Sequence, residues 1–304
     1  MAARKVKAMA NAATGADAPP KTRSERSFRP RLRFDLMTAI CAIILVAFII
    51  VALLANVLAP HGFAQIDLHA RKAPPILFGG SFKHILGTDE LGRDILSRIF
   101  YGLRTSLLIA LGASAISLTL GTVLGLLAAF GRGFADMLIR VAVDFQASMP
   151  FLIIALAVLA FFGDNLWLFM ALLGLYGWER YARLVRAMAG LELERGYVAA
   201  LRRNGAGTGR IAFLHVLPNI LSVVLVNLTI VLPEILLQES ALSFLGLGIQ
   251  PPLVSLGSMV GAGRDYVMTE WWIAILPGIV IFILSLSISL IGDYLRDVLD
   301  PTLH

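Results

Sequence analysis

The sequence predicts an all-α fold of six membrane-spanning helices, and three observations lead to this prediction. Apolar residues make up 58% and charged residues 15% of the 304 residues, whereas a typical soluble domain has about 25% charged residues. The apolar residues form long uncharged runs at 36–59, 105–131 and 271–292. Each run exceeds the roughly 20 residues that span the hydrocarbon core of a bilayer. The chain is therefore predicted to be a polytopic membrane protein.

The six expected helices follow from the runs and their boundaries. They cover 36–59, 104–130, 137–162, 165–188, 215–245 and 271–292. The fourth helix carries Glu179 and Arg180 and further arginines, which suits a helix whose basic end lies among lipid headgroups. The uncharged region 240–263 is rich in glycine and contains Pro251-Pro252. We expect a loop there and not a seventh span.

The distribution of basic residues predicts the topology. Residues 1–35 contain nine Lys and Arg without hydrophobic periodicity, so we expect a mostly disordered cytoplasmic tail. With this end inside, 19 Lys and Arg lie on the cytoplasmic side and 7 on the other side, as the positive-inside rule predicts. Both termini and a loop at 190–218 are then cytoplasmic, and 60–103 is an extracytoplasmic segment. The positive charge thus reflects topology and indicates no nucleic-acid partner.

The cytoplasmic loop has the composition of a bent pair of short helices. Ala199 and Ala200 are small enough for close packing, Gly205 suits the C-terminal cap of a helix, and Pro218 suits the start of the next span. Such a pair could dock in a groove of a partner, or its arginines could only hold anionic lipid. The candidate residues of the loop are Tyr197, Ala199, Ala200, Arg202, Gly205, Arg210, His215, Leu217 and Pro218.

Four blocks of the sequence carry a family resemblance. From Ala199 through Gly205 to Pro218 and Asn219, the loop resembles the EAA loop of permeases in ATP-binding-cassette (ABC) importers. The blocks at 86–98, 243–252 and 292–301 are similar to the C-type permease subunit of the dipeptide and oligopeptide systems, and the resemblance covers 34–301 in order. The chain departs from the family pattern at Gly196, where an acidic residue is usual, and at Leu201, Asn204, Gly207, Leu256 and Ser289.

This resemblance implies the architecture of a type I ABC-importer permease, with a permease core at 104–301. Its implied partners are a second homologous permease subunit, two cytoplasmic ATPase subunits and an extracytoplasmic solute-binding protein, all at the lipid bilayer of a bacterial inner membrane. The loop would transmit the closure of the ATPases to the spans. The implied cargo is a peptide or a polar solute of similar size, and a nickel complex, glutathione, an opine or a sugar remains an alternative.

Polar side chains at membrane depth are costly unless they face protein or water. Glu234, Gln238 and Glu239 lie in the fifth predicted helix, and Glu234 and Gln238 share a face at i, i+4. We expect these residues to line a wet translocation path. The main alternative is an ion-coupled secondary transporter that uses Asp144, Glu234 or Glu239. A structural membrane subunit without a path of its own is a third possibility.

The sequence shows no sign of an enzyme or of a bound cofactor. It has no Walker-type phosphate loop, because the glycine-rich stretch 205–209 lacks the preceding strand. Cys41 is the single cysteine, and we expect no metal site because the five histidines are too scattered to form a cluster. These histidines are His61, His69, His84, His215 and His304.

A charged block precedes the second predicted span. Its residues are Asp89, Glu90, Arg93 and Asp94. Acidic residues favour the N-terminus of a helix, so we expect helix capping and structural ion pairs. Contact with the cargo is the alternative.

Overall fold

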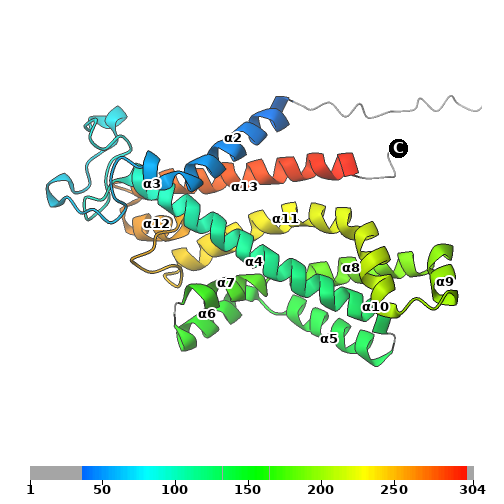
Figure 1. Ribbon diagram of the computed structural model, residues 1–304. Coiled ribbons are helices and arrows are strands. Elements are labelled where there is room, and N and C mark those ends of the chain that lie inside the picture. Colours follow the sequence, from blue (N-terminus) through cyan, green and yellow to red (C-terminus); the bar gives the residue numbers. More distant parts are fainter. Residues whose placement is uncertain (1–35, 132, 164, 300–304) are drawn as a thin grey trace, which may run out of the picture. The chain divides into compact units, whose positions relative to one another are not determined.

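The computed structural model describes residues 36–131, 133–163 and 165–299. Within these ranges all regular secondary structure is helical, apart from one isolated β-bridge between Thr88 and Asp94 (Figure 1). The predicted all-α fold is therefore confirmed for the described part of the chain. The predicted tail 1–35 and His304 lie outside the described residues.

Among the described residues, four helices are long and apolar enough to cross a membrane. They are α2 (Leu36–Leu53), α4 (Ile95–Gly131), the continuous run Thr208–Phe244 and α13 (Trp272–Leu299). The run Thr208–Phe244 consists of α10 (Thr208–Ile211), a π-helical turn η3 (Ala212–Val216) and α11 (Leu217–Phe244). The shorter helices are α3 (Ala55–Leu58), η1 (Leu68–Ala70), η2 (Ile76–Phe78), α5 (Phe134–Ser148), α6 (Phe151–Phe162), α7 (Leu166–Gly174), α8 (Trp178–Leu193), α9 (Gly196–Arg203), α12 (Leu256–Gly263) and η4 (Arg264–Tyr266).

Two of the six predicted spans are not single helices. α5 and α6 meet at 88° around Met149 and Pro150, because proline disfavours the helical conformation of the residue before it. Met149 is accordingly extended, with φ −91° and ψ 130°. The predicted helix 165–188 is divided into α7 and α8 by the turn at 175–177. The count of six continuous helices is thus not confirmed, and at most five spans result if the bent pair counts as one.

Two other boundaries differ because polar side chains cap helices. α4 begins at Ile95, before the predicted start at 104, since the Asp94 carboxylate accepts a hydrogen bond from Ser97 N at 2.8 Å. The expected loop at 240–263 contains the short helix α12. It begins with a capping box in which Ser255 and Ser258 each accept from the other's backbone N–H.

Small residues allow the long helices to approach closely. α4 packs along α8, and a Cβ added at Gly121 would lie 2.4 Å from Trp178 O, while one at Gly125 would lie 2.8 Å from Ala182 O. Small residues serve this purpose at helix interfaces in membranes. α13 lies beside both α2 and α11 (Figure 1). The core is therefore formed where α11 packs on α4, α8 and α13 and where α4 packs on α8.

The surface of α2 is suited to a bilayer or to another subunit. Only Cys41 and Ala52 of this helix are buried, and its sequence carries no charge.

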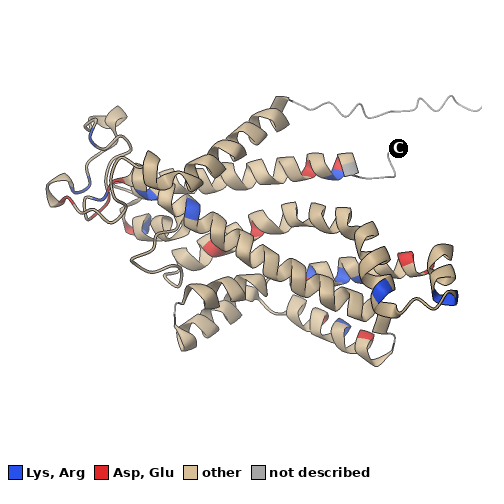
Figure 2. Ribbon diagram, in the orientation of Figure 1, with Lys and Arg blue, Asp and Glu red and all other residues tan. Residues whose placement is uncertain are grey.

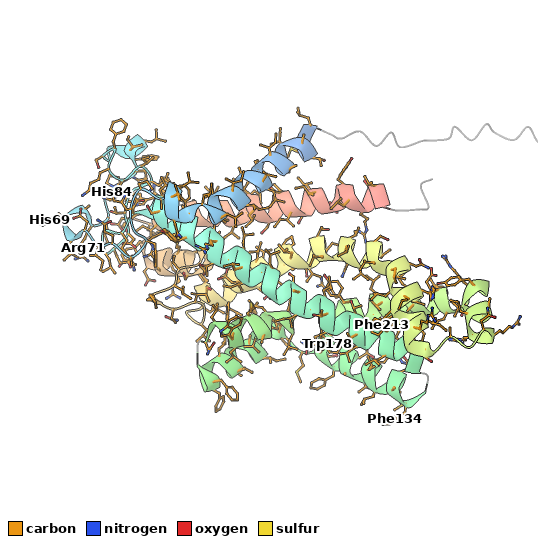
Figure 3. The ribbon with its side chains drawn as sticks, viewed as in Figure 1. His69, Arg71, His84, Phe134, Trp178 and Phe213 are labelled. Atoms are coloured by element: carbon orange, nitrogen blue, oxygen red, sulfur yellow. The ribbon has the colours of Figure 1, made fainter. Side chains whose placement is uncertain are left out.

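Figure 2 shows that charged residues gather in the segment before α4 and around α8 and α9, while the long helices are mostly without them. His84 of that segment and Phe213 of η3 lie at opposite ends of the helix array (Figure 3). The protein thus has an apolar middle between two polar ends.

Candidate coupling loop and polar groups within the helices

The 192–218 loop is a bent pair of helical segments, as its sequence predicts. After α9, Gly205 adopts φ +78°. Its N–H donates to Arg202 O at 3.0 Å, and Ala206 N–H donates to Leu201 O at 3.0 Å. This is the Schellman pattern, in which glycine is preferred because it has no Cβ to strain the left-handed conformation. The chain therefore reverses its course at Gly205.

The second half of the loop joins the membrane span without a break. His215 lies in the π-helical turn, and Leu217 N–H donates to Ala212 O, five residues earlier. Pro218 has no N–H to give to Leu214 O, which accounts for the altered hydrogen-bond pattern just before it. α10, η3 and α11 thus form one continuous run of helix from Thr208 to Phe244.

The loop is fastened by a few apolar side chains and exposes the rest. Val198, Ile211 and Val216 are fully buried and belong to the main hydrophobic cluster. The exposed side includes most of the predicted residues together with two large apolar side chains. These are Ala199, Ala200, Arg202, Gly205, Arg210 and Pro218, with Phe213 and Leu214 beside them. A basic and apolar surface therefore stands free at this end of the protein.

A polar cluster that the sequence did not reveal holds α9 in place. Glu192 is 6% exposed. Its carboxylate accepts a hydrogen bond from the Tyr197 hydroxyl at 2.8 Å and forms an ion pair with Arg195 at 3.1 Å. Asn219 Nδ2 donates to the same Tyr197 oxygen at 3.2 Å. Burial and the hydrogen bond to Glu192 raise the pKa of the Tyr197 hydroxyl above its ordinary value. The hydroxyl therefore stays protonated and bonded at physiological pH.

Of the three predicted path residues, Glu234 faces an open groove. The groove lies between α11 and α13 and has a volume of about 620 Å³. Its polar lining comes from Thr229, Glu234, Ser285, Ser289 and Asp293. The Glu234 carboxylate is 2.5 Å from Arg180 Nη1 of α8, so its charge is balanced across the helix interface.

Gln238 and Glu239 lie elsewhere. Gln238 is half-buried and does not line the groove. Glu239 is fully buried and accepts hydrogen bonds from the hydroxyls of Ser255 at 2.7 Å, Ser243 at 3.0 Å and Ser106 at 3.3 Å. It thereby connects α11 with α12 and α4. Asp144, the other acidic candidate, is exposed on α5.

The charged block before α4 has the expected structural contacts. Asp89 accepts from the backbone N–H of Leu91 and of Arg93, both at 2.9 Å, and from Arg93 Nε at 2.6 Å. Glu90 pairs with the same arginine at 3.1 Å. These bonds turn the chain toward the N-terminus of α4.

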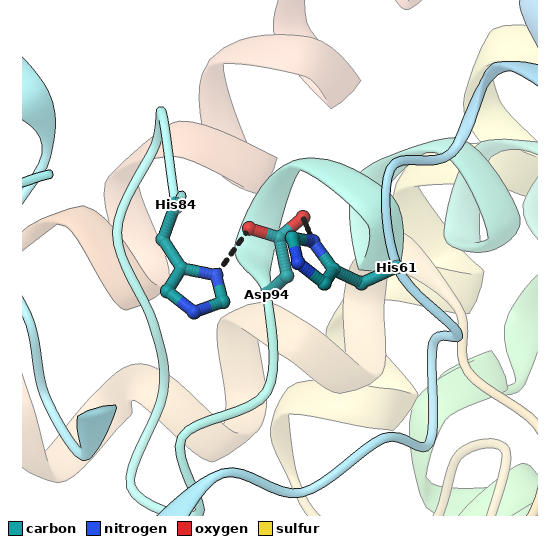
Figure 4. Close-up of side chains that lie close together, drawn as sticks. All are labelled: His61, His84 and Asp94. Carbon is teal, nitrogen blue, oxygen red and sulfur yellow. Dashed lines mark hydrogen bonds and ion pairs between the residues drawn. The ribbon is translucent and has the colours of Figure 1, made fainter. Parts of the chain in front are cut away.

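The expectation that all histidines are scattered is wrong for two of them. The rings of His61 and His84 lie 4.9 Å apart between centroids, and the Asp94 carboxylate lies beside both (Figure 4). They come together because the segment before α4 folds back over the start of that helix. Sequence spacing does not reveal such a contact.

Long apolar helices joined by an exposed helical loop define a polytopic membrane protein, and comparisons with known proteins identify its family. Residues 121–304 match the family described as binding-protein-dependent transport system inner membrane component. The chain belongs to this family. The resemblance found in the sequence is therefore confirmed.

Curated relatives narrow the family to peptide systems. The chain is 43% identical over 253 residues to the di/tripeptide transport system permease protein DppC of Pseudomonas aeruginosa, covering 83% of this chain and 84% of the relative. It is 38% identical over 262 residues to the dipeptide transport system permease protein DppC of Escherichia coli, covering 86% and 87%. The protein is thus an ABC-importer permease of the dipeptide transport family, a transport component and not an enzyme.

A solved structure shows the same fold. The permease of the MetNI methionine ABC transporter, in an inward-facing conformation, superposes with a TM-score of 0.56 at 21% identity, covering 68% of this chain and 98% of that chain. Permeases of this family are multi-pass proteins of the bacterial inner membrane and work with ATPase and binding-protein partners. Family membership decides against the ion-coupled secondary transporter.

Proposed function

We propose that this chain is the permease subunit of an ATP-driven importer for dipeptides, oligopeptides or polar solutes of similar size, and that the 192–218 loop couples ATPase motion to passage of the cargo. One observation carries the proposal: the exposed loop is continuous with the helix that lines the groove. A displacement of α10 by a partner would therefore be passed to α11, and with it to Glu234, along one continuous run of helix.

The exposed surface of the loop favours docking over simple lipid binding. Ala199 and Ala200 permit close approach of another protein, and Phe213 and Leu214 are 57% and 62% exposed. Exposed apolar side chains of this size mark contact with protein or membrane, so the preference for a protein partner rests on the small residues Ala199 and Ala200. The partners of the proposal are two cytoplasmic ATPases, a second homologous permease and an extracytoplasmic solute-binding protein.

The topology of the proposal has both termini in the cytoplasm. The 192–218 loop, with its arginines, and the segment before α4 lie at opposite ends of the helix array. The positive-inside rule puts the loop on the cytoplasmic side. The segment 60–94 then faces the solute-binding protein.

The groove between α11 and α13 supports a polar cargo. Its carboxylates, Glu234 and Asp293, and its hydroxyls could bind the amino and amide groups of a short peptide in a mostly apolar wall. Two relatives are named for dipeptide or di/tripeptide transport. A nickel complex, glutathione, an opine or a sugar is the alternative cargo.

Replacement of Gly205 tests the coupling role. A Cβ at this position meets nothing within 4 Å, but φ +78° is strained for any residue with a side chain. Gly205→Val should therefore alter the bend without filling occupied space. Gly190→Val in α8 is the matched control, because its Cβ also meets nothing within 4 Å and its φ lies outside the left-handed region.

The measurement is uptake of a labelled dipeptide by cells that carry the complete transporter. We expect Gly205→Val to abolish most uptake at unchanged membrane level, with Gly190→Val close to wild type. Normal uptake by Gly205→Val would contradict the coupling role. Wild-type uptake that survives ATP depletion would contradict the mechanism. Uptake that is inhibited by an excess of a sugar or a nickel complex, and not by an excess of other peptides, would contradict the cargo.

A further inference from the structure

Three side chains from distant parts of the segment before α4 form a compact donor set. His84 Nδ1 lies 3.0 Å from Asp94 Oδ1, and His61 Nδ1 lies 4.0 Å from Asp94 Oδ2. One donor atom from each residue lies within 4.8 Å of the other two. We propose that His61, His84 and Asp94 bind a divalent transition-metal ion of the Zn²⁺ class, which fastens the segment to the N-terminus of α4 (Figure 4).

The hydrogen bonding of this cluster is incomplete. His84 is 4% and Asp94 3% exposed. Among the described residues, neither His61 Nδ1 nor His84 Nε2 has a hydrogen-bond partner, although both atoms are buried. Buried polar atoms are nearly always paired, so unpaired ones call for an explanation. A ligand that takes the lone pair of His61 Nδ1 supplies an explanation for that atom.

The carboxylate of the cluster is held in place by its surroundings. Asp94 Oδ2 accepts from Ser97 N at 2.8 Å and from Ser97 Oγ at 2.7 Å. Outer contacts of this kind orient metal ligands and are part of most metal sites. Asp94 Oδ1 faces His84 Nδ1 at 3.0 Å, so a metal ion bound by both atoms would replace this hydrogen bond.

The donor set selects the class of ion. Two imidazole nitrogens and one carboxylate oxygen suit Zn²⁺, which binds such atoms at about 2.0–2.2 Å and leaves a fourth position for water. The His61 side chain is the one with freedom to complete the site, because it is 20% exposed while His84 and Asp94 are buried.

The expected consequence is a more rigid outer segment. The ion would join His61, just after α3, to His84 and to Asp94, the residue directly before α4. A ligand that binds only the folded segment stabilises it by mass action. This inference concerns the outer end of the protein and is independent of the coupling role proposed for the 192–218 loop.

Variants of single histidines test the site. His61→Gln removes one donor, yet it retains the bond between His84 and Asp94 and the backbone bond from His61 N to Ser97 Oγ at 3.1 Å. It should therefore fold. His69→Gln is the matched control, since His69 lies in the same segment outside the cluster and contributes a backbone N–H to Asp67.

The full chain is purified with its partner subunits, freed of any histidine tag and stripped with a chelator, and then dialysed against micromolar ZnCl₂. We expect His61→Gln and His84→Gln to bind one Zn²⁺ fewer per chain than wild type, and His69→Gln to match wild type. Zinc should slow proteolysis within 60–94 in wild type and not in His61→Gln. Equal zinc content in wild type and His61→Gln, or zinc without any such protection of the wild type, would overturn the proposal.

Discussion

Tyr197 of α9 donates a hydrogen bond of 2.8 Å to Glu192 at the end of α8, and Asn219 at the start of α11 donates to the same hydroxyl oxygen. Three helical segments are thus joined through one phenol. The hydroxyl lies at the base of the exposed loop, where the position of α9 relative to α11 is set. A rigid base is what a loop that transmits motion requires.

Removal of this hydroxyl should weaken coupling. Tyr197→Phe deletes both hydrogen bonds and leaves Glu192 with Arg195 and a longer contact from Asn219 Nδ2 at 3.5 Å, at a cost of about 1–3 kcal/mol in local stability. We expect reduced peptide uptake at unchanged membrane level, measured in cells. Tyr266→Phe at the other end of the protein is the control, because its ring contact with Lys72 is retained. Full uptake by Tyr197→Phe would show that the hydroxyl does not position the loop.

The pair between Glu234 and Arg180 should affect transport more than stability. Both side chains are about one-third exposed, and ion pairs open to water contribute at most about 1 kcal/mol. We expect Glu234→Gln to lower uptake several-fold while the complex still assembles, as judged by co-purification of its subunits. Asp144→Asn, on the exposed side of α5, should transport normally. A parallel loss of assembly and uptake in Glu234→Gln would instead assign this carboxylate a structural role.

Glu239 should act mainly on stability. Glu239→Ala leaves the hydroxyls of Ser106, Ser243 and Ser255 without their acceptor and opens a cavity, which should cost on the order of 3 kcal/mol. Glu239→Gln keeps an acceptor oxygen and should cost less. The melting temperature of the purified complex distinguishes the two, with the alanine variant expected to melt first. Equal melting of both variants would mean that the serines find other partners.

The outer segment should loosen in acid through Asp67. The hydrogen bond from Lys83 at 2.6 Å holds the pKa of the Asp67 carboxyl below its ordinary value of 3.8. Desolvation acts in the opposite direction and is the smaller effect. A pKa lowered in the folded state means that the carboxylate stabilises the fold above its unfolded-state value. This contribution is lost as the pH falls through the lower, folded-state value.

Proteolysis by an acid protease measures this effect. Between pH 5 and about pH 3, cleavage within 60–94 should increase more in wild type than in Asp67→Asn, which has no carboxylate to protonate at this position. The difference between the two should shrink at high salt, because the pair is exposed and screened. An identical pH profile for both would show that Asp67 does not hold the segment.

The sequence by itself determined the features that depend on short stretches of chain. The uncharged runs at 36–59 and 271–292 exceed the thickness of a bilayer, whatever they pack against. Gly205 ends α9 and Pro218 lies near the start of α11, because φ above zero and a missing N–H are properties of single residues. The family blocks likewise identify the permease without any knowledge of contacts.

Only the tertiary structure decided which distant residues meet. It divides the predicted span 165–188 by the turn at 175–177, it buries Glu239 among serines of three segments, and it brings His61 to His84. The same sequence pattern can place a charged side chain at membrane depth in a groove or in an interior hydrogen-bond network. Helical periodicity determines on which face of its own helix the side chain lies, but not which helix packs against that face. The neighbour is decided by how α4, α11 and α12 pack, and that depends on every interface at once.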